Sequence, residues 1–174
     1  MIRFQLLRPW LAVTLVMGSV VLISHAADPA PDAAVARARK QAQMLDDLYK
    51  TAIVLVTENY VQAESDLAAG DAFQAIFKVM KDKGYHEVRL LDATGEPYDT
   101  DNTPRKGFEE KAIKALKAGA ATYEEVVEVD GKRSLRIATA VPVVLKKCVM
   151  CHGHYAEAKP GAAIGALSYT IPVE

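Results

Sequence analysis

The chain has 174 residues, of which 51% are hydrophobic and 25% are charged, and its formal net charge at pH 7 is −1. This length is enough for one domain with a hydrophobic core of its own. Basic residues are scattered among acidic ones instead of forming a run, a pattern that is typical of a solvated surface and that predicts no nucleic-acid partner.

The first 26 residues have the pattern of a secretory signal peptide. Arg3 and Arg8 form a basic start, and an apolar run from Trp10 to Ile23 follows. Ser24-His25-Ala26 places small residues at the two positions that a signal peptidase reads, which predicts cleavage after Ala26. The alternative is an uncleaved membrane anchor, for which the apolar run is short, because a span takes about 20 residues. We therefore expect an exported, periplasmic protein.

Residues 27–31 form a short linker, and residues 32–174 are expected to form a single domain. Asp32 is a suitable N-cap for a first helix that extends to about Glu64. Apolar residues recur at helical spacing along one face. Within residues 52–56 the chain is apolar on every side, which predicts a fully buried stretch. The apolar face consists of Val35, Ala38, Ala42, Leu45, Tyr49, Ala52, Val56 and Ala63.

Two further helices and a strand follow. Asp71 is expected to cap a second helix that ends at Gly84, with Phe73, Ile76, Phe77 and Met80 on its inner face. Residues 85–91 read as a strand, and residues 92–95 read as a turn. A third helix is expected from Arg105 to Lys117, with Phe108, Ala112, Ile113 and Leu116 facing inward.

The C-terminal part reads as antiparallel strands. Residues 123–129, the turn Asp130-Gly131 and residues 132–143 predict a hairpin. A last strand is expected over residues 163–173. The fold class is therefore α+β, with an antiparallel sheet and the N-terminal helices packed on one side.

The run Cys148-Val149-Met150-Cys151-His152 is a C-x-x-C-H sequence, the attachment sequence of a c-type haem. The two thiols can form thioether bonds with the two vinyl groups of one porphyrin. The adjacent imidazole of His152 then lies beneath the ring as the proximal iron ligand. This run predicts one covalent haem c, attached between the last strands.

Two other uses of the cysteines remain open. A zinc site would need four ligands, and only His154 is nearby as a fourth, which makes the site cramped. A thioredoxin-like pair would normally follow a strand and open a helix of a βαβ unit, which this run does not. A structural disulfide across two residues would be strained.

Several segments resemble, in order, the PAS-like periplasmic c-haem domain family, and they extend over nearly all of the chain after the signal peptide. This family occurs alone or as the extracytoplasmic sensor of membrane signalling proteins. The resemblance implies a PAS-like fold and haem binding. The matching segments are Gly84-Tyr85, Asp101-Asn102-Thr103-Pro104, Lys117-Ala118-Gly119, Asp130-Gly131-Lys132-Arg133, the run Lys147 to Gly153, Lys159-Pro160-Gly161, and Gly165 to Pro172 with its Gly-x-x-Ser-x-x-Ile-Pro pattern.

The sequence departs from this family at the sixth iron ligand. Some members supply a distal cysteine before the second helix, but residues 69–73 of this chain contain no cysteine and no other usual iron ligand. Met44 and Tyr60 on the first helix are the distal candidates, and Met80 and His86 are weaker ones. His154 is too close to His152 to reach the opposite face of the haem, so a propionate or solvent contact is expected for it.

The expected function is a redox-responsive or small-gas-responsive haem module, with a diatomic molecule as the possible ligand. The alternative is a mono-haem electron-transfer cytochrome. An enzyme such as a peroxidase would need a distal acid–base pair, which the sequence does not supply, so we expect no enzymatic activity. The expected partners are the cytochrome c maturation machinery and either a redox protein or a membrane signalling protein.

Overall fold

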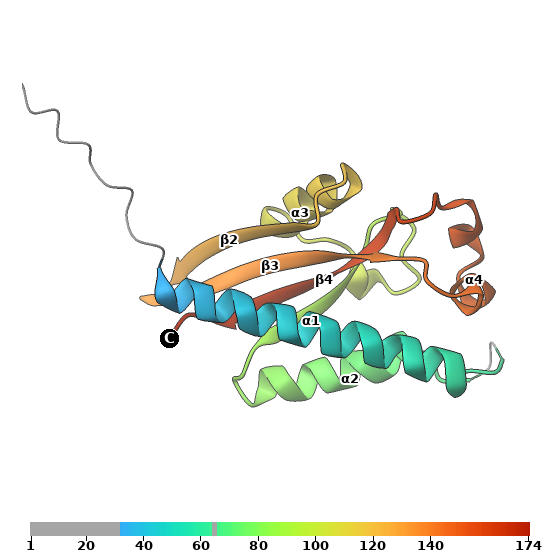
Figure 1. Ribbon diagram of the computed structural model, residues 1–174, viewed down its shortest axis with the longest axis horizontal. Coiled ribbons are helices and arrows are strands. Elements are labelled where there is room, and N and C mark those ends of the chain that lie inside the picture. The colour runs from blue at the N-terminus through green and yellow to red at the C-terminus, as the bar shows by residue number, and fades with distance from the viewer. Residues whose placement is uncertain (1–31, 64–65) are drawn as a thin grey trace, which may run out of the picture. The chain divides into compact units, whose positions relative to one another are not determined.

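A computed structural model describes residues 32–63 and 66–174 of the chain (Figure 1). The expected signal peptide at residues 1–26 and the linker at 27–31 lie outside the described residues. Among the helices of the described residues, none combines the length and the apolar character needed to cross a membrane.

Two N-terminal helices are present, as expected, although their bounds differ from the expectation. Helix α1 spans Ala33–Asn59, and the Asp32 side chain accepts hydrogen bonds from the amides of Ala34 and Val35, which confirms the N-cap. The helix ends before Glu64 because the Asp66 carboxylate accepts from the amides of Gln62 and Ala63, which favours a turn there.

Helix α2 spans Ala69–Asp82, so the predicted N-cap was wrong. Asp71 lies inside the first turn, where its carboxylate faces the positive end of the helix dipole. The C-terminal end is confirmed: Gly84 has φ +74°, a conformation that glycine adopts without strain.

Four antiparallel strands form one sheet in the order β1-β4-β3-β2. The predicted hairpin and last strand are confirmed within one residue at each end. The third helix begins at Phe108 instead of Arg105, because Gly107 at its N-cap has φ +92°. The elements after α2 are β1 (Glu87–Asp92), η1 (Thr100–Asn102), α3 (Phe108–Lys117), β2 (Thr122–Val129), β3 (Lys132–Pro142), α4 (Lys146–Cys151), η2 (Gly153–Glu157) and β4 (Ala163–Pro172).

The sheet is covered on both faces, because alternate residues of a strand point to opposite sides. Leu135, Ile137 and Tyr169 pack against α1 and α2 in one cluster. Ala138 and Ala166, which point to the opposite face of the sheet, pack against α3 in a second cluster. The N-terminal helices therefore share one face of the sheet, as predicted, and α3 covers the other (Figure 1).

The predicted inner faces of the helices are largely confirmed. Val35, Ala38, Ala42 and Tyr49 of α1 are buried, as are Phe73 and Phe77 of α2 and Phe108, Ala112 and Leu116 of α3. Three expectations were wrong. Ala63 lies beyond the end of α1 and is exposed. Leu55 is 53% exposed, because α1 has the sheet on one side only, and Ile76 is 41% exposed on the outer side of α2.

Candidate haem-attachment site

The C-x-x-C-H run lies at one end of the sheet, in the connection from β3 to β4. Cys148 and Cys151 are on the short helix α4, and His152 is its C-cap (Figure 1). Residues three apart on a helix share a face, so the two thiols point to the same side. Both are free and half-buried. Two thiols in this arrangement can both react with one flat molecule lying along that side.

Helix α4 is attached to the end of α1 by Lys147. Its ammonium donates to the backbone oxygens of Glu58 at 2.8 Å and Val61 at 2.7 Å. Carbonyl groups at the C-terminal end of a helix lack partners within the helix, and a cation there also faces the negative end of the dipole. The contact satisfies two carbonyl groups and fixes the position of the cysteine-bearing helix.

Aromatic rings surround the imidazole of His152. The ring of Tyr98 stacks on it with centroids 4.9 Å apart, and the ring of Tyr155 stacks on it at 4.7 Å. His154 contacts Tyr98 and Tyr155 at centroid distances of 5.1 and 4.3 Å. His152 is thus half-buried in an aromatic cluster formed by the loop after β1 and by η2.

Burial and the neighbouring charge of His154 lower the pKa of His152, and Asp92 opposes this by raising it. A neutral imidazole has a free lone pair, which is the form that binds a metal. Nδ1 of His152 is buried without a hydrogen-bond partner, as is Nε2 of His154. Burial also raises the pKa of Tyr155 to about 12, with a further contribution from Asp92, so its phenol stays protonated.

The loop that carries Tyr98 is anchored to the rest of the fold. Arg89 on β1 donates to the backbone oxygen of Asp101 at 2.5 Å, and Gln74 on α2 donates to the Asn102 side chain at 3.2 Å. Asp92 accepts from the amide of Gly95 at 2.6 Å and so forms the turn that begins the loop. These contacts explain why Tyr98, from a distant part of the sequence, lies against His152.

A family model described as Tll0287-like matches residues 28–172. The chain belongs to the Tll0287-like family. Comparison with curated proteins found no match. The matched range includes every helix and strand of the described structure, together with the C-x-x-C-H run, so the membership covers the fold and the site together.

The two distal candidates of this Tll0287-like chain lie in different places. Tyr60 is the C-cap of α1, next to the carbonyl groups that Lys147 binds, and its side chain is 78% exposed. Met44 is 63% exposed and lies near the middle of α1. The helix from Met44 to Glu58 extends about 21 Å, at about 1.5 Å per residue. The structure therefore brings the segment of Tyr60 to the site and does not bring Met44 there.

Among the described residues, no group of three or more His, Cys, Asp or Glu side chains converges to hold a metal ion. Of the weaker distal candidates, His86 is buried and hydrogen-bonded to Tyr49, and Met80 is half-buried on α2. A metal at the site would therefore need ligands from a bound group in addition to His152.

Several residues of the Tll0287-like site were not predicted from the sequence. Tyr155 and Lys147 are adjacent to the C-x-x-C-H run, and this proximity alone would have identified them as neighbours. Tyr98 and Asp92 come from the region after β1, and no local pattern in the sequence connects them to His152. The pairing of β1 with β4 and the contacts of the loop after β1 bring that region to the end of the sheet where the run lies.

Proposed function

We propose that this protein carries one haem c, bound through thioether bonds to Cys148 and Cys151 and through iron to His152. The observation that carries the proposal is the presence of two free thiols on one side of α4, followed directly by a half-buried histidine. The depressed pKa of His152 favours the neutral form that a ferric or ferrous iron needs. The haem would supply a redox-active iron with a sixth position for a ligand.

The surroundings of His152 suit such a group. Tyr98 and Tyr155 present flat apolar surfaces, and the imidazole is half-buried against them. The unpartnered Nδ1 of His152 could donate to an acceptor once the ring is fixed by metal binding, which is the usual arrangement for a ligating histidine. The orphan Nε2 of His154 could serve a propionate in the same way.

We propose a redox-responsive or small-gas-responsive haem module as the role. The positions of the two distal candidates support this, because Met44 lies far along α1 and the Tyr60 side chain extends into solvent. An iron without a strong sixth ligand accepts CO or NO, and it could bind Tyr60 weakly in the ferric state. Such an iron is less suited to electron transfer, which needs a stable six-coordinate centre.

Export to the periplasm, cleavage after Ala26 and a PAS-like relationship belong to the same proposal. Covalent haem attachment in bacteria takes place outside the cytoplasmic membrane, so the cytochrome c maturation machinery would be a partner. The arrangement of N-terminal helices on one face of an antiparallel sheet is compatible with a PAS-like origin. A response to redox state or gas would pass to a separate protein.

Optical and electron paramagnetic resonance spectra of the ferric and ferrous protein test the role. We expect high-spin ferrous iron that binds CO, and a Tyr60→Phe variant whose ferric spectrum differs from that of the wild type if the phenol coordinates. The matched control is Tyr85→Phe, another exposed tyrosine, on the turn before β1. Low-spin spectra in both oxidation states without CO binding would contradict the sensor role and favour electron transfer.

A further inference from the structure

Helix α1 has a row of exposed apolar side chains on the side that faces away from the sheet. Met44, Leu48 and Leu55 are each more than half exposed, and we call these three residues the apolar row. Their spacings of four and seven residues place them on one stripe of the helix, because seven residues make about two turns. Single exposed apolar residues are common on protein surfaces, but a row at heptad spacing is typical of a helix that packs against a second helix.

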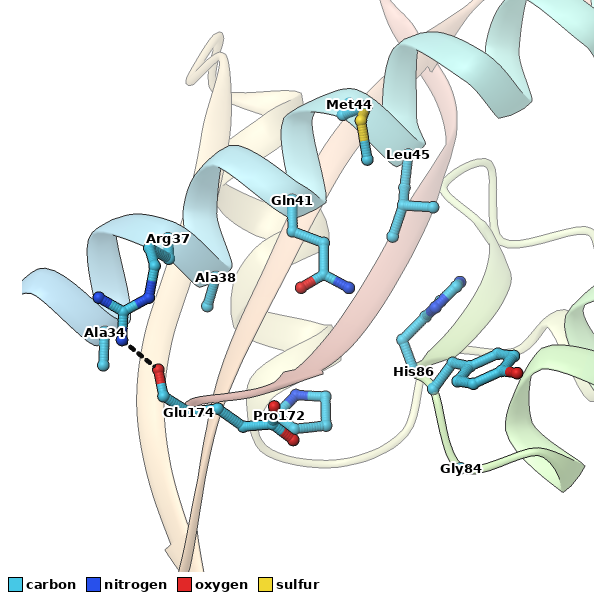
Figure 2. Close-up of a pocket in the computed structure, with 11 residues that line it drawn as sticks. Ala34, Arg37, Ala38, Gln41, Met44, Leu45, Gly84, His86, Pro172 and Glu174 are labelled. Carbon is cyan, nitrogen blue, oxygen red and sulfur yellow. Dashed lines mark hydrogen bonds between the residues drawn. The ribbon is translucent and has the colours of Figure 1, made fainter.

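The surfaces beside the apolar row suit a second helix. Helices α1 and α2 lie side by side on one face of the sheet (Figure 1), and Ile76 and Val79 of α2 are exposed as well. Next to Met44, a groove of about 490 Å³ lies between α1, the turn before β1 and the end of the chain after β4 (Figure 2). Met44 and Leu45 line it from α1, and His86 lines it from the other side. A side chain of a second helix can enter such a hollow, as in knobs-into-holes packing.

Two residues of opposite charge lie at the two ends of the apolar row. Lys40 precedes the row, Glu58 follows it, and both are exposed. They are about five turns apart on α1, so they lie on the same side of the helix, about 27 Å from each other. Neither forms an ion pair among the described residues. This side of the helix is therefore positive at one end of the row and negative at the other.

We propose that the apolar row binds a second copy of this chain, with the two α1 helices antiparallel and related by a two-fold axis near Leu48. In this arrangement Lys40 of each copy lies beside the partner's Glu58, and Met44 with its groove lies opposite the partner's Leu55. The two-fold symmetry forms each contact twice. A parallel pair in register would instead place Lys40 beside the partner's Lys40, so the charges favour the antiparallel orientation.

The dimer surface is separate from the cysteine segment, and a membrane fits it less well than a second copy does. Helix α4 is attached through Lys147 to backbone oxygens at the end of α1, and the apolar row takes no part in that contact. Dimerisation therefore does not depend on a haem. Asp47 and Glu58 are exposed beside the row, and these carboxylates would be repelled by anionic lipid headgroups, which prefer basic flanks.

Sedimentation equilibrium of the purified protein tests the proposal through an exchange of charges. We expect a reversible monomer–dimer equilibrium for the wild type. Lys40→Glu and Glu58→Lys should each weaken dimerisation about tenfold, because each variant places like charges together twice. The double variant Lys40→Glu/Glu58→Lys restores opposite charges and should return the dissociation constant to within about threefold of the wild-type value. This rescue must occur between copies, since the two positions are about 27 Å apart within one chain.

Leu48→Asp should weaken the dimer about a hundredfold or more, because it places two carboxylates at the centre of the contact. Lys114→Glu is the matched control: it makes the same charge change on α3, which covers the opposite face of the sheet, and should leave dimerisation unchanged. Circular dichroism should show that all variants are folded.

The proposal is overturned by a wild-type protein that stays monomeric at about 1 mM, or by a double variant that dimerises no better than the single ones. Equal effects of Lys40→Glu and Lys114→Glu would overturn it as well. Binding of the monomer to vesicles of anionic phospholipid, lost in Leu48→Asp, would show that lipid and not a second copy covers the apolar row.

Discussion

The sheet and the C-x-x-C-H segment differ in how fully their side chains are buried and hydrogen-bonded within the protein. In the sheet, Leu135, Leu167 and Tyr169 are completely buried, and β3 pairs with β4 in one register from Ser134 to Val141. Buried polar groups there are mostly paired: the Tyr169 hydroxyl donates to Asp46 at 2.9 Å, and the exception is Nε of Arg136 on β3. In the segment from α4 to η2, the side chains of Cys148, Cys151 and His152 are only half-buried.

The unpaired polar atoms show the same contrast. Three buried side-chain nitrogen or oxygen atoms lack a partner among the described residues, and two of them belong to His152 and His154. Buried polar groups in folded proteins are almost always paired, so orphaned ones need an explanation. The third is Nε of Arg136 on β3, so the sheet has one such atom, whereas two neighbouring residues of the histidine segment each have unused bonding capacity. A bound group would use that capacity.

The largest effect on stability is expected in the sheet. Leu135→Ala should lower the free energy of unfolding by about 3–5 kcal/mol, because it leaves a cavity in a fully buried cluster. Val126→Ala on β2, where the side chain is 46% exposed, is the control and should cost less than about 1 kcal/mol. Chemical denaturation measures both. Equal losses would mean that the sheet is not the main source of stability.

A smaller loss of stability is expected from Glu109→Gln. Through Arg89, Glu109 is linked to both the sheet and the loop beside His152. Glu109 is 2% exposed and accepts hydrogen bonds from the Arg89 guanidinium and from the Arg105 amide. Loss of its charge should cost about 2–3 kcal/mol, below the usual range for a fully buried pair because Arg89 is partly exposed.

Arg89 also holds the loop that carries Tyr98, so Glu109→Gln should change the environment of His152 as well. Histidine ring resonances in nuclear magnetic resonance spectra report this change. The control is Glu110→Gln, the exposed neighbour on α3. If the His152 resonances stay unchanged in a destabilised Glu109→Gln protein, the loop is held by other contacts.

Lys147→Met should weaken the attachment of α4 to α1. Two hydrogen bonds from the ammonium are lost, at a cost of about 1–2 kcal/mol, because such bonds involve a charged donor but remain partly open to solvent. Hydrogen exchange should become faster at the amides of the last turn of α1. Lys146→Met, one residue earlier and exposed, is the control. Similar exchange in the two variants would show that Lys147 does not hold α4.

The smallest effect concerns the pH dependence of stability through His86. Burial lowers the pKa of His86 in the folded protein, whereas the unfolded chain takes up a proton near pH 6.5, at about the model-peptide value. Below that pH the unfolded state therefore binds more protons, and stability falls as the pH drops toward the folded pKa. His86→Gln should reduce the loss of Tm between about pH 7.5 and about pH 5.5. An unchanged slope would contradict the role of burial.

The helices and strands of this fold could be predicted largely from sequence, because their patterns are local. The Asp32 cap, the Asp130-Gly131 turn and the alternation in β3 each depend on residues close in the chain. The predicted C-terminal end of α1 was wrong because the turn formed by Asp66 with the amides of Gln62 and Ala63, although local, was not recognised. The predicted start of α2 was wrong because the burial of Ala69 depends on tertiary contacts. Helix α4 was not predicted, since it has little more than one turn.

The candidate site could be predicted only where it is continuous in sequence. Cys148, Cys151 and His152 were identified from their spacing alone. The partners of His152 could not be, because Tyr98 reaches it through the pairing of β1 with β4 and through the contacts of Arg89. The groove beside His86 also required the structure, since it combines α1, the turn before β1 and the chain after β4.

Intact-protein mass spectrometry of the denatured protein, produced in a host that attaches haem c, tests the central proposal most directly. We expect the mass of the chain without residues 1–26 plus one haem, and an acid–acetone extraction that leaves the haem with the protein. The Cys148→Ala/Cys151→Ala variant should show the mass of the apo-protein. A wild-type protein without added mass, or with haem that extracts into acetone, would contradict the account.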